Sequence, residues 1–122
     1  GYMATLVADI PRWIQYIIEK SVIDFATYEQ FKGKTADELV AHFDKSVEAA
    51  KKALAGITDD GLKELFYLRH GEKELLNSPK HESISQAINH LVHHRGQLTV
   101  YLRMNDLKIP SIYGPSGDSG GF

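Results

Sequence analysis

Apolar residues recur every three or four positions over residues 2–20, as they do on one face of an amphipathic helix. The stripe consists of Met3, Leu6, Ile10, Trp13, Ile14 and Ile17. Pro11 lies inside this segment and lacks the backbone N–H that the helical hydrogen-bond ladder needs. We therefore expect a helix over 2–20 that is kinked at Pro11, or, as the alternative, two short helices that meet near Ile10.

A second helix is predicted over residues 35–55. Thr35 is followed three residues later by Glu38, which is the spacing of a capping box. Apolar residues keep helical spacing after this cap, and Gly56 is expected to end the helix. Residues 21–34 show no clear period, so we expect a connection that packs its aromatic side chains on the domain, namely Phe25, Tyr28 and Phe31.

Residues 58–80 are ambiguous. The run "LFYLRHGEKELLN" fits a frayed helix or two short extended arms that turn at His70–Gly71, because so short a run has no decisive period. We favour extended or irregular structure.

A third long helix is predicted over residues 83–103, after Pro79. Ser83 and Gln86 have the spacing of a second capping box. The apolar positions of this helix are Ile84, Ile88, Leu91, Leu98 and Leu102. Residues 104–122 are broken by glycine and proline, so we expect an irregular tail whose last half dozen residues are mobile. Its apolar residues are expected to pack back on the helices, namely Ile109, Ile112 and Tyr113.

Composition narrows the chemistry. A chain of 122 residues fits one domain, and a net charge of −2 gives no electrostatic reason to expect nucleic acid or an anionic membrane as a partner. The absence of cysteine excludes disulfides and thiolate chemistry, and it leaves His, Asp and Glu as the strong metal ligands. No apolar run is long enough to span a bilayer and no secretion signal is evident, so we expect a soluble protein of the reducing cytoplasm.

The segment "NHLVHHRGQLTVYL", residues 89–102, carries three histidines within the third helix. His90 and His94 are four residues apart, so their side chains lie one above the other and can reach a single ion. Helical periodicity turns this pair inward and His93 outward. The alternative is an inert, hydrogen-bonded pair, and a catalytic zinc site would need a third ligand from another helix.

Other residues of interest are expected to be structural. Arg95 projects toward the apolar stripe, so we expect it to anchor carbonyls of the tail or a carboxylate, rather than a substrate. Gly96 lies in mid-helix and costs about 1 kcal/mol relative to alanine, which predicts a close helix or tail contact. His42, His70 and His81 lie among polar neighbours and are predicted to be solvated.

The segment "INHLVHHRGQLTVYLRMNDLKIPSIYGPSGD" resembles the C-terminal signature of the DinB/YfiT-like superfamily of small bacterial proteins, and this resemblance is specific over residues 84–118. The segment "GYMATLVADIPRWI" is similar to the second helix of that family, so most of the chain is covered. The resemblance implies an all-α fold, an up-and-down four-helix bundle with an irregular C-terminal tail. It places residues 1–122 in a single domain.

The resemblance also implies a divalent metal, often nickel or zinc. The family commonly holds it with one histidine from the second helix and an HxxxH pair from the last. His90 and His94 match that pair, and His93 matches the additional histidine of the "HHRGQ" run. Aligning the family's second helix on "MATLVADIP" places Leu6 at the usual histidine position, which leaves a two-histidine remnant. Asp9 is the candidate third ligand, unless it only complements the helix dipole.

A second departure concerns the start of the chain, where the family's first helix has no counterpart. The remaining helices would then expose an apolar face, and such faces are normally covered by a partner. We expect either a missing N-terminal helix or a homodimer, as is common in this family.

Two functions are compatible with this resemblance. The first is an enzyme similar to the family's metal-dependent thiol transferases or hydrolases, in which the cation lowers the pKa of a low-molecular-weight thiol or of water. His90 and His94 would be its ligands and Tyr101 a nearby polar group. The second is a non-catalytic interaction or stress-associated protein with a vestigial metal site, which Leu6 favours.

Overall fold

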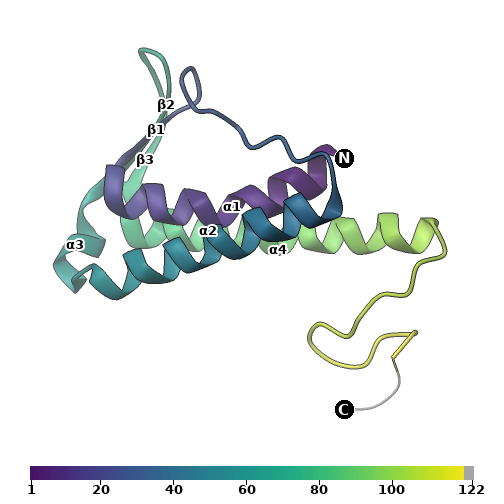
Figure 1. The fold of residues 1–122 in the computed structure, drawn as a ribbon. Helices are drawn as coiled ribbons and strands as arrows, with labels where there is room; N and C mark the ends of the chain where they lie inside the picture. The colour runs from purple at the N-terminus through teal and green to yellow at the C-terminus, as the bar shows by residue number, and fades with distance from the viewer. Residues whose placement is uncertain (120–122) are drawn as a thin grey trace.

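Three long helices lie side by side in the computed structural model, which describes residues 1–119 (Figure 1). The elements are α1 (Tyr2–Lys20), β1 (Val22–Asp24), α2 (Ala36–Gly56), α3 (Asp59–Lys63), β2 (Leu65–His70), β3 (Lys73–Pro79) and α4 (Lys80–Met104). The strands gather beyond the C-terminal end of α1, and the tail leads away from the far end of α4 (Figure 1). None of the described helices is both long and apolar enough to cross a membrane.

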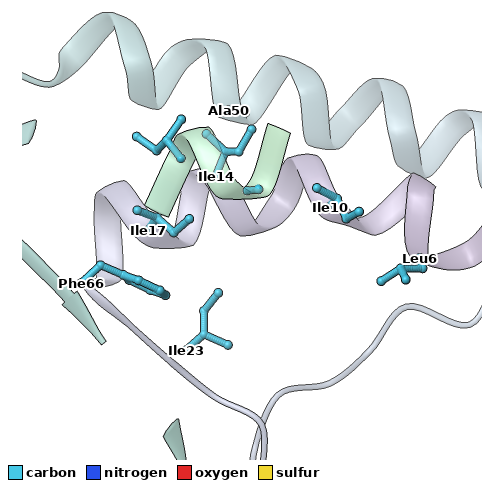
Figure 2. Packing of buried hydrophobic residues seen from close by; sticks show 9 residues of the cluster. Leu6, Ile10, Ile14, Ile17, Ile23, Ala50 and Phe66 are labelled. Carbon is cyan, nitrogen blue, oxygen red and sulfur yellow. The ribbon is translucent and has the colours of Figure 1, made fainter. Parts of the chain in front are cut away.

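Helix α1 is the central element because both α2 and α4 pack against it. The predicted stripe forms the core: Leu6, Ile10, Ile14 and Ile17 are buried (Figure 2). Burying each such aliphatic side chain contributes about 1.5–3 kcal/mol. They meet residues from the sheet and the other two long helices, namely Ile23, Ala50, Phe66, Ile84 and Ala87. The helix continues through Pro11 without interruption, so the alternative of two short helices is wrong.

The predicted all-α bundle is wrong, because the chain also forms a three-stranded sheet in the order β1-β2-β3. β1 pairs with β2 in parallel, and β2 pairs with β3 as an antiparallel hairpin. The hairpin turns at Gly71, whose φ of 60° is one that glycine adopts readily. The extended interpretation of residues 58–80 is therefore confirmed for 65–79, while the short helix α3 was not foreseen.

Two polar side chains join elements that are far apart in the sequence, one within the sheet and one between helices. Asp24 Oδ1 accepts hydrogen bonds from the backbone N–H of Gly71, at 2.8 Å, and of Ala26, at 2.9 Å. These two bonds lower the pKa of Asp24. The buried Lys80 Nζ donates to Glu64 Oε2, at 2.8 Å, and to a carbonyl in the last turn of α1, Ile18 O, at 3.1 Å. Lys80 thus holds the start of α4 against the end of α1.

The helix ends test the two predicted capping boxes. At Thr35 both reciprocal hydrogen bonds of the box with Glu38 are present, which confirms the first prediction. The second is wrong, because α4 begins three residues before Ser83, directly after Pro79. The Ser83 hydroxyl instead lies 2.6 Å from the hydroxyl of Ser78, and both side chains are buried.

The tail after α4 has no helix or named strand among its described residues. An ion pair between Arg103 and Asp118, at 2.9 Å, holds part of it near the helix. Ile109 is half-buried, whereas Ile112 and Tyr113 are exposed, so the expected packing of those two is wrong. The expected mobility of the chain end falls in part on residues 120–122, which lie outside the described residues.

Gly96 does not mark a close contact, contrary to the sequence-based expectation. A Cβ built at this position meets no heavy atom within 4 Å among the described residues. We predict that Gly96→Ala raises the free energy of unfolding by about 1 kcal/mol, because alanine is the better helix former and nothing obstructs it. Urea titration followed by circular dichroism measures the change. A lower stability for Gly96→Ala would show that the position is crowded after all.

Candidate metal site and the buried carboxylate

His90 and His94 lie together on α4, with ring centroids 4.5 Å apart. Both are half-buried and line a cavity of about 410 Å³ that α1 and the connection after β1 also enclose. His93 is exposed, although its ring centroid lies 5.0 Å from that of His94. The structure thus brings together the predicted pair and turns the third histidine of the run outward.

The chemical state of the pair suits metal coordination. His94 Nδ1 lies 2.7 Å from Gln97 Oε1, a distance at which Nδ1–H donates and the Nε2 lone pair stays available. Ligating histidines commonly carry such a partner on their second ring nitrogen. Burial, reinforced by His94 and His93, lowers the pKa of His90. His90 is therefore neutral at neutral pH, the form in which an imidazole binds a cation.

A third protein ligand is not in place beside the pair. Leu6 lines the same cavity and is only 6% exposed, so a packed leucine occupies the position where the resemblance implies a histidine ligand. Over residues 1–119 no three His, Cys, Asp or Glu side chains are grouped so that they could hold a metal ion. Gln30 also lines the cavity and offers an amide oxygen. The strong ligands at this cavity are thus two imidazoles. Zinc and nickel both bind imidazole, but two protein ligands do not complete a site.

Asp9, the candidate third ligand, is engaged elsewhere. Its side chain is 1% exposed, and Arg12 contacts both oxygens, with Nη2 donating to Oδ2 at 3.0 Å and Nε 2.9 Å from Oδ1. The Tyr28 hydroxyl donates to Oδ2 at 2.8 Å, and His42 Nε2 donates to Oδ1 at 2.7 Å. A buried carboxylate needs such partners to offset its lost hydration. The four side chains form a cluster, called here the Asp9 cluster.

His42 is the main site residue that the sequence did not reveal. It was expected to be solvated, but its side chain is only 14% exposed and its ring stacks on Phe31, with centroids 3.7 Å apart. A signal was present, since His42 shares a helix face with the small residues Ser46, Ala50 and Ala53, all of them buried. A histidine in line with small apolar positions packs toward the neighbouring helix.

Asp9 and His42, together with the neighbouring Ser46, have the residue types of a catalytic triad but not its connectivity. Ser46 Oγ lies 3.5 Å from His42 Nε2, the same nitrogen that already donates to Asp9. A relay would need the serine and the carboxylate on opposite ring nitrogens. Burial, together with the neighbouring Asp9, raises the pKa of Tyr28, so its hydroxyl stays a neutral donor. The geometry is that of a structural anchor.

The remaining candidates lie apart from the histidine pair. Arg95 donates to the Tyr113 hydroxyl at 2.8 Å, so it contacts the tail, though through a side chain and not through a carbonyl or carboxylate. Tyr101 is 54% exposed and lines a different cavity, with Tyr2 and Leu98. Exposed His81 has Nδ1 3.1 Å from a backbone carbonyl of α3, and His70 is exposed at the hairpin turn, as predicted.

Comparison with known proteins identifies one family. The model described as "DinB family" matches residues 12–119. The matched residues include His90 and His94 but begin after Leu6 and Asp9. No curated protein and no solved structure matches the chain.

We predict that Asp9→Asn lowers the free energy of unfolding by about 3 kcal/mol, because it removes the charge that compensates Arg12 within a buried pair. Asp44→Asn at an exposed position of α2 is the control, and it should change the free energy of unfolding by less than about 0.5 kcal/mol. Urea unfolding of both variants gives the comparison. Equal effects would contradict the anchoring role of Asp9.

Proposed function

The chain belongs to the DinB family, and on that premise we propose that His90 and His94 hold a divalent metal, nickel or zinc, at the cavity between α1 and α4. The observation that carries the proposal is the geometry of the pair, whose rings lie 4.5 Å apart with His94 Nδ1 fixed by Gln97. The pair supplies two ligands, so the remaining coordination positions are left to water or to a small molecule.

This arrangement favours an open, weak site over a closed structural one. A structural zinc site commonly has four protein ligands. Leu6 lines this cavity and has no atom that could bind a metal. When bound, the cation would lower the pKa of a coordinated thiol or water and so provide a nucleophile at neutral pH. We therefore propose thiol transfer or hydrolysis of a small molecule as the activity. His90 and His94 would position the cation, and Leu6 and Trp13 would restrict the water around it.

The second candidate function is a non-catalytic interaction protein, favoured by a specific surface. Ile88, Val92 and Leu102 share one face of α4 and are 45%, 37% and 36% exposed. We propose that this α4 face contacts a second copy of the chain. A homodimer of this kind needs no metal. The side chain of Leu6 would then contribute only to the packing of the protein.

We predict that nickel or zinc raises the melting temperature of the metal-free protein and that His90→Ala and His94→Ala abolish the rise. At a hundredfold excess over its dissociation constant, a metal that binds only the folded state adds about 2.7 kcal/mol. For a domain of this size that is roughly 10 °C. The rise should shrink as the pH falls, because protonated imidazole does not bind the cation. Differential scanning calorimetry and elemental analysis measure the two quantities.

The control for this experiment is His70→Ala, which removes an exposed histidine at the hairpin turn. It should respond to metal as the parent does. If the parent shows no rise, or if all three variants respond alike, the pair is not a metal site and the interaction function stands alone.

We also predict that Val92→Glu converts the dimer to a monomer, because a charge on the α4 face opposes burial against a second copy. Val40→Glu makes the same substitution at a valine of α2 that is 60% exposed, and it should leave the dimer intact. Sedimentation equilibrium gives the mass of each. A parent that is monomeric at every concentration would exclude the dimer.

A further inference from the structure

The connection from β1 to α2 forms one wall of the cavity of the histidine pair. In Figure 1 it leaves the sheet, passes along α1 and reaches the start of α2. Its side chains of Phe25, Tyr28 and Gln30 line the cavity, and the other lining residues come from α1 and α4. A second, apolar cavity of about 390 Å³ adjoins it on the side of the sheet, and Phe25 lines both. We call residues 25–31 the strap.

Arg12 of α1 fastens the strap at two points. Its Nε donates to the Tyr28 hydroxyl at 3.0 Å, and its Nη2 donates to the backbone carbonyl of Glu29 at 2.8 Å. The Tyr28 hydroxyl in turn donates to Asp9 Oδ2 at 2.8 Å. A guanidinium presents its N–H groups in a fixed, planar fork, which an ammonium on a flexible stem cannot reproduce. One arginine therefore holds both the strap and the buried carboxylate.

Aromatic contacts hold the strap at its two ends. The ring of Phe25 meets Trp13 edge to face, with centroids 6.1 Å apart, and Tyr28 meets the same indole at 6.4 Å. At the other end Phe31 stacks on His42 of α2, with centroids 3.7 Å apart. The middle of the strap, between these rings, is the part that Arg12 holds.

Little apolar burial holds the middle of the strap. Thr27, Glu29 and Gln30 are exposed, and Tyr28 is only half-buried. Segments of this kind, without helix or strand, open locally at a small cost in free energy unless specific contacts hold them. The hydrogen bonds of Arg12 are therefore the contacts that keep the middle of the strap on the cavity.

We infer that Arg12 is a positioning residue, which keeps the strap on the cavity through Tyr28 and Glu29. The strap then limits access to His90 and His94. Arg12 is not among the described residues that line this cavity, so it acts through the strap. As a control on metal loading the inference rests on the proposed function, whereas access to the two imidazole rings does not depend on a metal.

Access is measured on chelator-treated protein, by carbethoxylation with diethylpyrocarbonate and mass spectrometry of each histidine. His93 is exposed on the same helix and is the internal reference. We expect His90 and His94 to react more slowly than His93 in the parent. Tyr28→Phe keeps the ring and removes the hydroxyl. It should raise the reactivity of the pair relative to His93 about fivefold, the factor that corresponds to one ordinary hydrogen bond.

Arg12→Lys keeps a charge beside Asp9 but loses the fork, so it should raise the reactivity of the pair at least as much as Tyr28→Phe. Two control variants should leave that reactivity unchanged, and neither position is among the described residues that line the cavity. Tyr16→Phe makes the same substitution at a tyrosine of α1 that packs against Tyr28. Ile14→Val weakens the core, so it separates an open strap from a general loss of stability.

A second readout concerns the proposed metal. Transfer of zinc from the protein to a chromogenic chelator should be about fivefold faster in Tyr28→Phe than in the parent. Tyr16→Phe should release zinc at the parental rate. A parent that binds no zinc would remove the metal proposal and leave the carbethoxylation result standing.

Three results would overturn the inference. The first is a parent in which His90 and His94 already react as fast as His93. The second is an unchanged reactivity of the pair, or an unchanged rate of zinc release, in both strap variants. The third is an equal rise in Ile14→Val, which would assign the effect to stability. Tyr28→Phe leaves Arg12 in contact with Asp9, and circular dichroism should confirm that it folds.

Discussion

The buried carboxylate of Asp9 is the interaction on which the arrangement of the long helices depends. A charge with 1% exposure is tolerated only where donors replace its water, and here Arg12, Tyr28 and His42 do so. These donors come from α1, from the connection after β1 and from α2. One carboxylate therefore fixes a helix and a loop on the same side of α1, and it explains how residues 25–35 keep a defined path without helix or strand.

The aliphatic stripe of α1 packs against the sheet, α4 and Ala50 of α2. Lys80 joins α4 to α1 at one end through Ile18 O. Both cavities lie beside His90. Tyr28 connects the Asp9 cluster with the cavity of the histidine pair, because its side chain belongs to the cluster and also lines that cavity. A change at Asp9 would therefore reach the cavity of the histidine pair through the position of Tyr28.

Two local signals in the sequence were reliable, whereas the Ser83 capping box and the pairing of distant strands were not predicted correctly. The stripe over 2–20 and the Thr35 capping box depend on residues a few positions apart, and both are present. β1 has three residues, too few for a period, and its partner lies more than forty residues away. The all-α expectation failed because the resemblance implied a bundle, and the extended arms expected within 58–80 were not combined into a sheet with β1.

The same distinction holds for the candidate site. The i,i+4 spacing of His90 and His94 predicted their proximity, because helical geometry alone determines it. Whether a third ligand exists depends on which residue of α1 faces the pair, and spacing within α4 carries no information on that. His42 was missed for a related reason: its partner Asp9 is 33 residues away. Only the helix face that His42 shares with Ser46 and Ala50 hinted at its burial.

His90 and Trp13 form a wall that two cavities share. Each of the two rings lines both cavities, and the ring centroids lie 5.6 Å apart. A change in the orientation of either ring would therefore alter the shape of both cavities. Trp13 comes from α1 and His90 from α4, so the relative position of these two helices determines both spaces. The histidine pair and the apolar cavity beside it are thus linked by packing between α1 and α4.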